Sequence, residues 1–100
     1  MSHIEAYQED IQSLCGQFGI ASLFAFGSVV TDRFNGQSDI DLMVEIEDTD
    51  PLTYSDKYFN LKFALEKLFG RKIDLLEQRA IRNPLLMQEI DRTKVALYGA

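Results

Sequence analysis

Residues 26–46 read FGSVVTDRFNGQSDIDLMVEI, in which a Gly-Ser turn precedes two aspartates by ten residues. The second half of this stretch alternates between two kinds of side chain, which predicts a β-strand over residues 39–46 with two distinct faces. One face carries Ile40, Leu42, Val44 and Ile46, and the other carries Asp39, Asp41, Met43 and Glu45. Asp39 and Asp41 would then leave the same face about 6.5 Å apart, close enough to converge on one or two cations.

The first half of the stretch predicts a turn that can approach phosphate. Residues 20–26 (IASLFAF) are almost wholly apolar and bounded by glycines, which is typical of a buried strand. Gly27 follows at its end and lets the backbone approach a ligand closely, while Ser28 could cap a short helix over residues 29–34. The amides at the start of such a helix would face an anion.

The remaining periodicity predicts a small sheet covered by helices, an α/β (α+β) arrangement with three to four strands. The expected helices span residues 4–18, 54–69 and 84–92, and the expected further strands span residues 71–77 and 94–98. Gly19 and Gly70 are placed to end two of the helices, and Asn83 is placed to cap the third ahead of Pro84. The Tyr and Phe residues of the helix over residues 54–69 have the spacing of core residues.

Composition predicts one compact domain, residues 1–100, with 46% hydrophobic and 26% charged residues. The net charge of −6 argues against sequence-independent nucleic-acid binding and favours cations, metal-bound nucleotides or a basic protein partner. The single cysteine, Cys15, fits the core face of its helix and cannot form an intramolecular disulfide. No stretch has the composition of a signal peptide or a membrane span, so the cytoplasm is the expected location.

Asp74 is the third carboxylate that could join the first two. It lies between Ile73 and Leu75 in a strand candidate, and the tripeptide Ile-Asp-Leu also occurs at residues 40–42. Two copies with dissimilar flanks do not make a repeat architecture. If the two strands are neighbours, however, Asp74 stands beside Asp39 and Asp41, and a divalent cation such as Mg²⁺ would offset the repulsion among the three. The alternative is a strand whose polar residues simply face water.

The combination of Gly27-Ser28, ten residues, Asp39-x-Asp41 and a later Asp74 resembles the nucleotidyltransferase superfamily that includes the palm of polymerase beta. The short length and residues 72–99 resemble in particular the minimal nucleotidyltransferase (MNT) domains of prokaryotes. The resemblance implies the palm-like mixed-sheet fold of that superfamily. It also implies that the three aspartates bind one or two Mg²⁺ ions and that Asp74 helps to activate the acceptor hydroxyl.

The resemblance further implies a nucleotide triphosphate held by Gly27, Ser28, Arg33 and Ser38. Many relatives have Arg-Gly where this chain has Thr31-Asp32, so Arg33 is the expected phosphate contact here. The implied activity is transfer of NMP, with AMP from ATP as the expected case, to a hydroxyl of a protein partner.

The implied partner is a HEPN-class toxin, for which the chain would be the antitoxin. Two other functions stay open on the sequence: a non-catalytic module that neutralises such a toxin by contact, and nucleotidyl transfer to a small molecule such as an aminoglycoside. A homo-oligomer is also left open.

Overall fold

The computed structural model describes residues 6–27 and 40–99. The elements along the chain are α2 (Gln8–Gln17), β1 (Ser22–Phe26), β2 (Ile40–Glu45), α3 (Pro51–Phe69), β3 (Ile73–Glu77), the 3-10 helix η2 (Gln78–Ala80), α4 (Pro84–Thr93) and β4 (Val95–Tyr98). Every strand and long helix that the periodicity predicts is therefore confirmed within these ranges. The short helix predicted over residues 29–34 lies outside the described residues.

The four strands form one mixed sheet in the order β3-β2-β1-β4. The inner strand β1 runs antiparallel to its neighbours β2 and β4. The other inner strand, β2, runs parallel to β3. A parallel pair needs a crossover connection, and α3 provides it. The two strands are neighbours, which the sequence left as a condition, and their two Ile-Asp-Leu tripeptides lie side by side in register.

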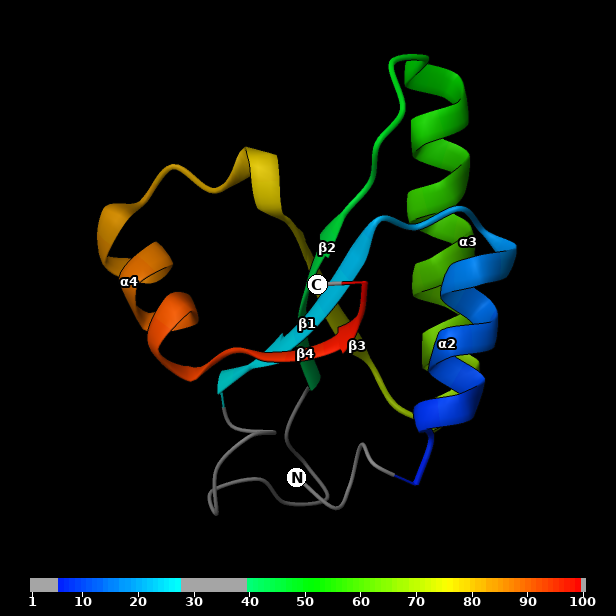
Figure 1. Ribbon diagram of the computed structural model, residues 1–100, viewed down its shortest axis with the longest axis horizontal. Helices are drawn as coiled ribbons and strands as arrows, with labels where there is room; N and C mark the ends of the chain where they lie inside the picture. The colour runs from blue at the N-terminus through cyan, green and yellow to red at the C-terminus, as the bar shows by residue number, and fades with distance from the viewer. Residues whose placement is uncertain (1–5, 28–39, 100) are drawn as a thin grey trace.

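One face of the sheet is covered by α2 and α3, which lie together on the same side of it (Figure 1). Alternate residues of β2 face these helices. Three of them, Ile40, Leu42 and Val44, are buried in the core. Cys15 of α2 is fully buried there, as predicted. Burial raises the pKa of its thiol to about 12, so the thiol stays protonated at neutral pH.

The opposite face of the sheet is partly covered by α4, on the other side from α2 and α3 (Figure 1). Met43 projects from this face together with the polar residues of β2, as the alternation predicts. It is nevertheless fully buried, in a small second cluster with Phe26 and Ile90. This face is therefore apolar in the middle and polar toward both ends of β2.

The helix ends follow the predicted chemistry. Asn83 caps α4 by accepting hydrogen bonds from the backbone N–H groups of Leu85 and Leu86, with Pro84 at the first helical position. Gly70 ends α3 in the left-handed conformation, at φ 65°. Among the helices of the described ranges, none is long and apolar enough to cross a membrane.

The aromatic residues of α3 divide between the core and the solvent. Tyr54 is buried, in agreement with the prediction that these side chains belong to the core. The prediction is wrong for Phe59 and Phe63, whose relative exposures are 48% and 60%. Their positions lie on the side of the helix opposite the core-facing Leu61, which is fully buried.

Candidate active site

The candidate site lies where β1 ends and where β2 and β3 begin. The antiparallel register places Phe26 opposite Asp41, and the parallel register places Asp41 directly beside Asp74. Neighbouring strands are about 4.8 Å apart, so the two aspartates leave the same face of the sheet at close range. Asp41 is half-buried and Asp74 is exposed, which keeps the pair accessible from solvent.

The backbone at Gly27 approaches the Asp41 carboxylate closely. Its φ of 72° is one that L side chains rarely adopt, and a Cβ at this position would lie 2.8 Å from Oδ2 of Asp41. Any side chain here would therefore strain the turn and also push against the carboxylate. The glycine predicted to follow the first strand thus serves close approach to an aspartate, in addition to any approach to phosphate.

The remaining predicted site residues, Ser28, Arg33, Ser38 and Asp39, lie outside the described residues. Within residues 6–27 and 40–99, no three His, Cys, Asp or Glu side chains converge as a metal site. The pair of Asp41 and Asp74 is the part of the predicted three-carboxylate cluster that the structure describes. Their hard oxygen donors are of the kind that Mg²⁺ prefers, so the donor set fits that ion.

A family model described as "Polymerase beta, Nucleotidyltransferase" matches residues 9–100. The chain belongs to this family. A relative from Methanocaldococcus jannaschii, MJ1379, carries the provisional name of protein adenylyltransferase and is 33% identical over 75 residues. The match covers 75% of this chain and 74% of that relative.

Solved structures of nucleotidyltransferases share the fold. One provisionally named minimal nucleotidyltransferase is 32% identical, with a TM-score of 0.75 over 92% of this chain and 90% of that one. A chain from the complex of an MNT antitoxin with a tri-AMPylated Shewanella oneidensis HEPN toxin is 21% identical. Its TM-score is 0.64 over 96% of this chain and 72% of that one, a likeness of fold alone.

As a nucleotidyltransferase, the chain is an enzyme that acts on a nucleotide. The mixed sheet with helices on both faces is the fold of these relatives, so the sequence-based assignment of family and fold class is confirmed. Asp41 and Asp74 alternate with the core-facing residues of their strands, so they leave the other face of the sheet, where Asp41 is half-buried and Asp74 is exposed.

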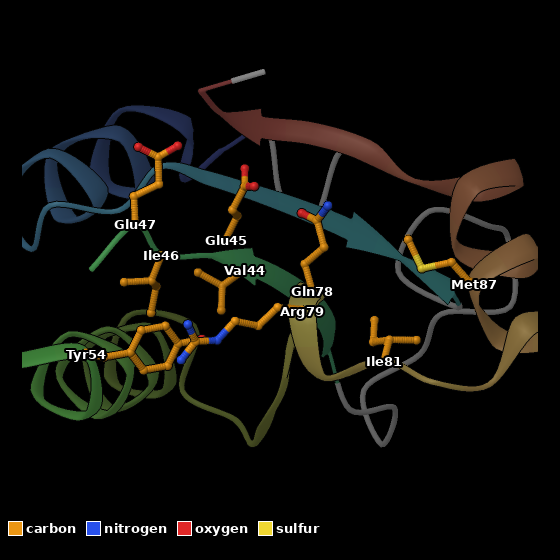
Figure 2. Close-up of a pocket in the computed structure, with 9 residues that line it drawn as sticks. All are labelled: Val44, Glu45, Ile46, Glu47, Tyr54, Gln78, Arg79, Ile81 and Met87. Carbon is orange, nitrogen blue, oxygen red and sulfur yellow. The ribbon is translucent and has the colours of Figure 1, made fainter. Parts of the chain in front are cut away.

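A cavity of about 410 Å³ lies at the other end of the nucleotidyltransferase sheet, near the carboxyl end of β2. Figure 2 shows Glu45 and Glu47 projecting to one side of the strand, with Val44 and Ile46 to the other. Glu45 lies four residues beyond Asp41, about 13 Å along the strand. The cavity and the aspartate pair are therefore separate features.

Arg79 forms part of the cavity wall, where its guanidinium carbon stacks 3.9 Å from the centroid of the Tyr54 ring (Figure 2). The Tyr54 hydroxyl donates a hydrogen bond of 2.9 Å to Oε2 of Glu77. Burial, and next this bond to a carboxylate, raise the pKa of Tyr54 above its ordinary value. Neither Arg79 nor Tyr54 belongs to a recognisable motif, and the helical spacing of Tyr54 predicted only a core position.

Tyr58 ties α3 to the edge strand β3. Its hydroxyl donates a 2.6 Å hydrogen bond to the backbone carbonyl of Leu75. Burial, followed by the charges of Glu77 and Asp74, raises the pKa of Tyr58. Because Asp74 and Leu75 are adjacent in β3, this bond helps to hold the strand that carries the second aspartate.

Proposed function

We propose that this nucleotidyltransferase transfers AMP from ATP to a hydroxyl group of a partner protein of the HEPN toxin class, and that it acts as the antitoxin of that pair. The observation that carries the proposal is the adjacency of Asp41 and Asp74 at the end of β1, where Gly27 lies close to the Asp41 carboxylate. The provisional name of MJ1379 supports protein as the acceptor. The AMPylated HEPN toxin in the Shewanella oneidensis complex supports the choice of partner.

Asp39, Asp41 and Asp74 are the residues proposed to hold Mg²⁺, as one or two ions. When bound, Mg²⁺ would neutralise charge on the triphosphate and offset the repulsion between the carboxylates. Asp74 is exposed and stands at the start of an edge strand, so an incoming acceptor can reach its carboxylate. We assign to it the added role of accepting the proton of the acceptor hydroxyl.

The nucleotide is assigned to Gly27, Ser28, Arg33 and Ser38. Gly27 leaves room at the end of β1, and Ser28 follows it directly, so backbone amides and a hydroxyl can approach the phosphates there. Arg33 would pair with phosphate oxygens through its guanidinium. These groups would fix the α-phosphorus close to Asp41.

The reaction itself is a substitution at the α-phosphorus of ATP. The acceptor hydroxyl oxygen forms a bond to that phosphorus, the bond from the α-phosphorus to the bridging oxygen breaks, and pyrophosphate leaves with that electron pair. The hydroxyl proton passes to the carboxylate of Asp74 and then to water. The products are an AMP ester of the acceptor and pyrophosphate, so no oxidant or further reactant is needed.

The acceptor would be presented by the partner. A net charge of −6 favours association with a basic surface, and opposite charges across an interface raise the rate of encounter. A partner with a positively charged RNA-binding face would meet this condition.

The direct test is transfer of radiolabel from α-labelled ATP to a co-expressed HEPN partner. We expect Asp41→Asn to lower transfer at least about 100-fold, because it removes a metal ligand and a full charge from the site. Glu45→Gln is the matched control, since Glu45 lies on the same strand and its Oε1 accepts a 3.0 Å hydrogen bond from Ser22. It should retain transfer within about threefold.

Unchanged transfer in Asp41→Asn would contradict the proposal. If neither the wild type nor Asp41→Asn transfers label while both still neutralise the toxin, the chain is a binding module instead. Label appearing on an aminoglycoside but not on the toxin would identify a small-molecule acceptor.

A further inference from the structure

The outward face of α3 carries a line of exposed apolar side chains. Leu52, Phe59 and Phe63 have relative exposures of 78%, 48% and 60%. They are seven and four residues apart, close to whole turns, so they follow one side of the helix. The rings of Phe59 and Phe63 stack with centroids 6.0 Å apart. Contiguous exposed apolar residues, aromatic ones especially, are typical of a protein interface.

This outer stripe, defined as Leu52, Phe59 and Phe63 of α3 together with its C-cap Gly70, is symmetric about the level of Leu61. Phe59 and Phe63 lie two residues to either side of that level, and Leu52 and Gly70 lie nine to either side. A two-fold axis there would set each Phe59 against the Phe63 of another copy, with each Leu52 above a Gly70. Gly70 has space for this contact, because a Cβ built there would meet no atom within 4 Å.

Charged residues beside the outer stripe obey the same symmetry. Asp56 and Lys67 are both exposed and eleven residues apart, close to three turns, so they flank the stripe on one side. Their midpoint lies between residues 61 and 62, about 0.75 Å along the helix from the level of Leu61. In an antiparallel pair of helices related by a two-fold axis, residues on the same flank meet. Asp56 of each copy would therefore face Lys67 of the other.

We infer that the outer stripe binds a second copy of this chain, with the two α3 helices packed antiparallel across a two-fold axis. Such an interface uses the same patch on both subunits, so residues at equal distances from the axis must be complementary. Two pairs of the outer stripe meet that requirement, and so does the charged pair beside it. A different partner would not need this symmetry.

The inference is independent of the proposed transfer reaction. The outer stripe lies on α3, whereas Asp41 and Asp74 leave the sheet face opposite the one that α3 covers. Both copies in the pair would thus keep their aspartates directed away from the interface.

The test is the mass of the full chain, purified alone, by sedimentation equilibrium at a concentration of about 100 μM. The wild-type chain should give about twice the monomer mass of 11.4 kDa. Phe63→Glu should give the monomer mass, because it places two carboxylates in the apolar contact. Leu85→Glu is the control: Leu85 is 75% exposed on α4, away from the stripe, and this variant should remain dimeric.

Charge reversal tests the register without altering the apolar contact. Asp56→Lys should weaken dimerisation about tenfold, since two lysines would then face each other at two places. The combined Asp56→Lys and Lys67→Asp variant should recover most of that loss. Circular dichroism confirms that each variant is folded. A wild-type monomer at this concentration, a dimeric Phe63→Glu, or a double variant no tighter than the single one would each overturn the inference.

Discussion

The two ends of the β2–β3 pair carry the same kind of side chain in different settings. At the carboxyl end, Glu45 and Glu77 each accept a hydrogen bond from a neutral hydroxyl, at 3.0 and 2.9 Å. At the amino end, Asp41 and Asp74 stand next to each other in register, with Gly27 close to the Asp41 carboxylate. Hydrogen bonds from hydroxyl groups are an ordinary way for a protein to stabilise a carboxylate, and both glutamates at the carboxyl end have one.

We propose that this difference separates structural carboxylates from those used in the transfer reaction. Like charges placed directly opposite each other on paired strands are destabilising. Hydroxyl partners, by contrast, contribute modestly to stability and fix side-chain positions. The expected effects of substitution therefore differ in kind between the two ends.

The largest expected effect is a loss of AMP transfer at one carboxylate of β3, whereas substitution of the other should lower stability instead. Asp74→Asn should lower AMP transfer about 100-fold or more with little loss of stability, because it relieves repulsion while removing a proposed ligand and proton acceptor. Glu77→Gln should leave transfer within about threefold but lower the free energy of unfolding by about 1 kcal/mol, since it weakens the Tyr54 bond. Label transfer and urea unfolding measure the two quantities. If only Glu77→Gln lost transfer, the carboxyl end of the strand pair would be the catalytic one and the proposed role of Asp74 would be wrong.

A smaller effect is expected at the glycines. Gly27 and Gly70 share the left-handed conformation, at φ 72° and 65°, so alanine at either should cost about 1 kcal/mol of stability. The Gly27→Ala methyl would also lie 2.8 Å from the Asp41 carboxylate, whereas at Gly70 it meets nothing within 4 Å. Transfer should fall about tenfold in Gly27→Ala and stay unchanged in Gly70→Ala. Equal transfer rates for the two variants would show that crowding Asp41 has no consequence.

The smallest effect concerns alkaline pH. The pKa of Tyr54 is raised above its ordinary value of 10.0 by burial and by Glu77. The protonated hydroxyl is favoured in the folded state, so this stabilisation is complete below about pH 10 and is lost as the pH rises through the folded-state pKa. Tyr54→Phe should therefore lose less stability than the wild type as the pH rises above about 10. The measurement is the thermal unfolding of both proteins across this pH range. If the stability of the two falls in parallel, ionisation of Tyr54 does not cause the loss.

Much of the fold is predictable because local chemistry and periodicity agree with it. Alternation defines β2, and Asn83 and Gly70 define helix ends through groups that act within a few residues. The pairing of Asp41 with Asp74 could be predicted only as a condition on strand order, because sequence spacing does not specify which strands are neighbours. The roles of Gly27, Ser28, Arg33 and Ser38 and of the three aspartates remain predictions.

Other features depend on tertiary packing that no local pattern contains. Met43 alternates with apolar residues as an outward position would, and only the return of α4 over the sheet buries it. Phe59 has an apolar side chain near the core spacing of α3 yet faces outward, because burial follows its angle around the helix. The stacking of Arg79 on Tyr54 joins residues 25 positions apart, with no motif to indicate it.

The paired Ile-Asp-Leu tripeptides also protect the sheet against misalignment. Shifting β3 by one residue along β2 would turn Asp74 toward the apolar core and Ile73 toward water, at a cost of several kcal/mol. A two-residue shift would keep the faces but set Asp41 beside Lys72 or Leu76 instead of Asp74. Of these alignments, only the observed one brings the aspartates together, and it also buries both isoleucines and both leucines. A correctly folded sheet is then sufficient to assemble this half of the site.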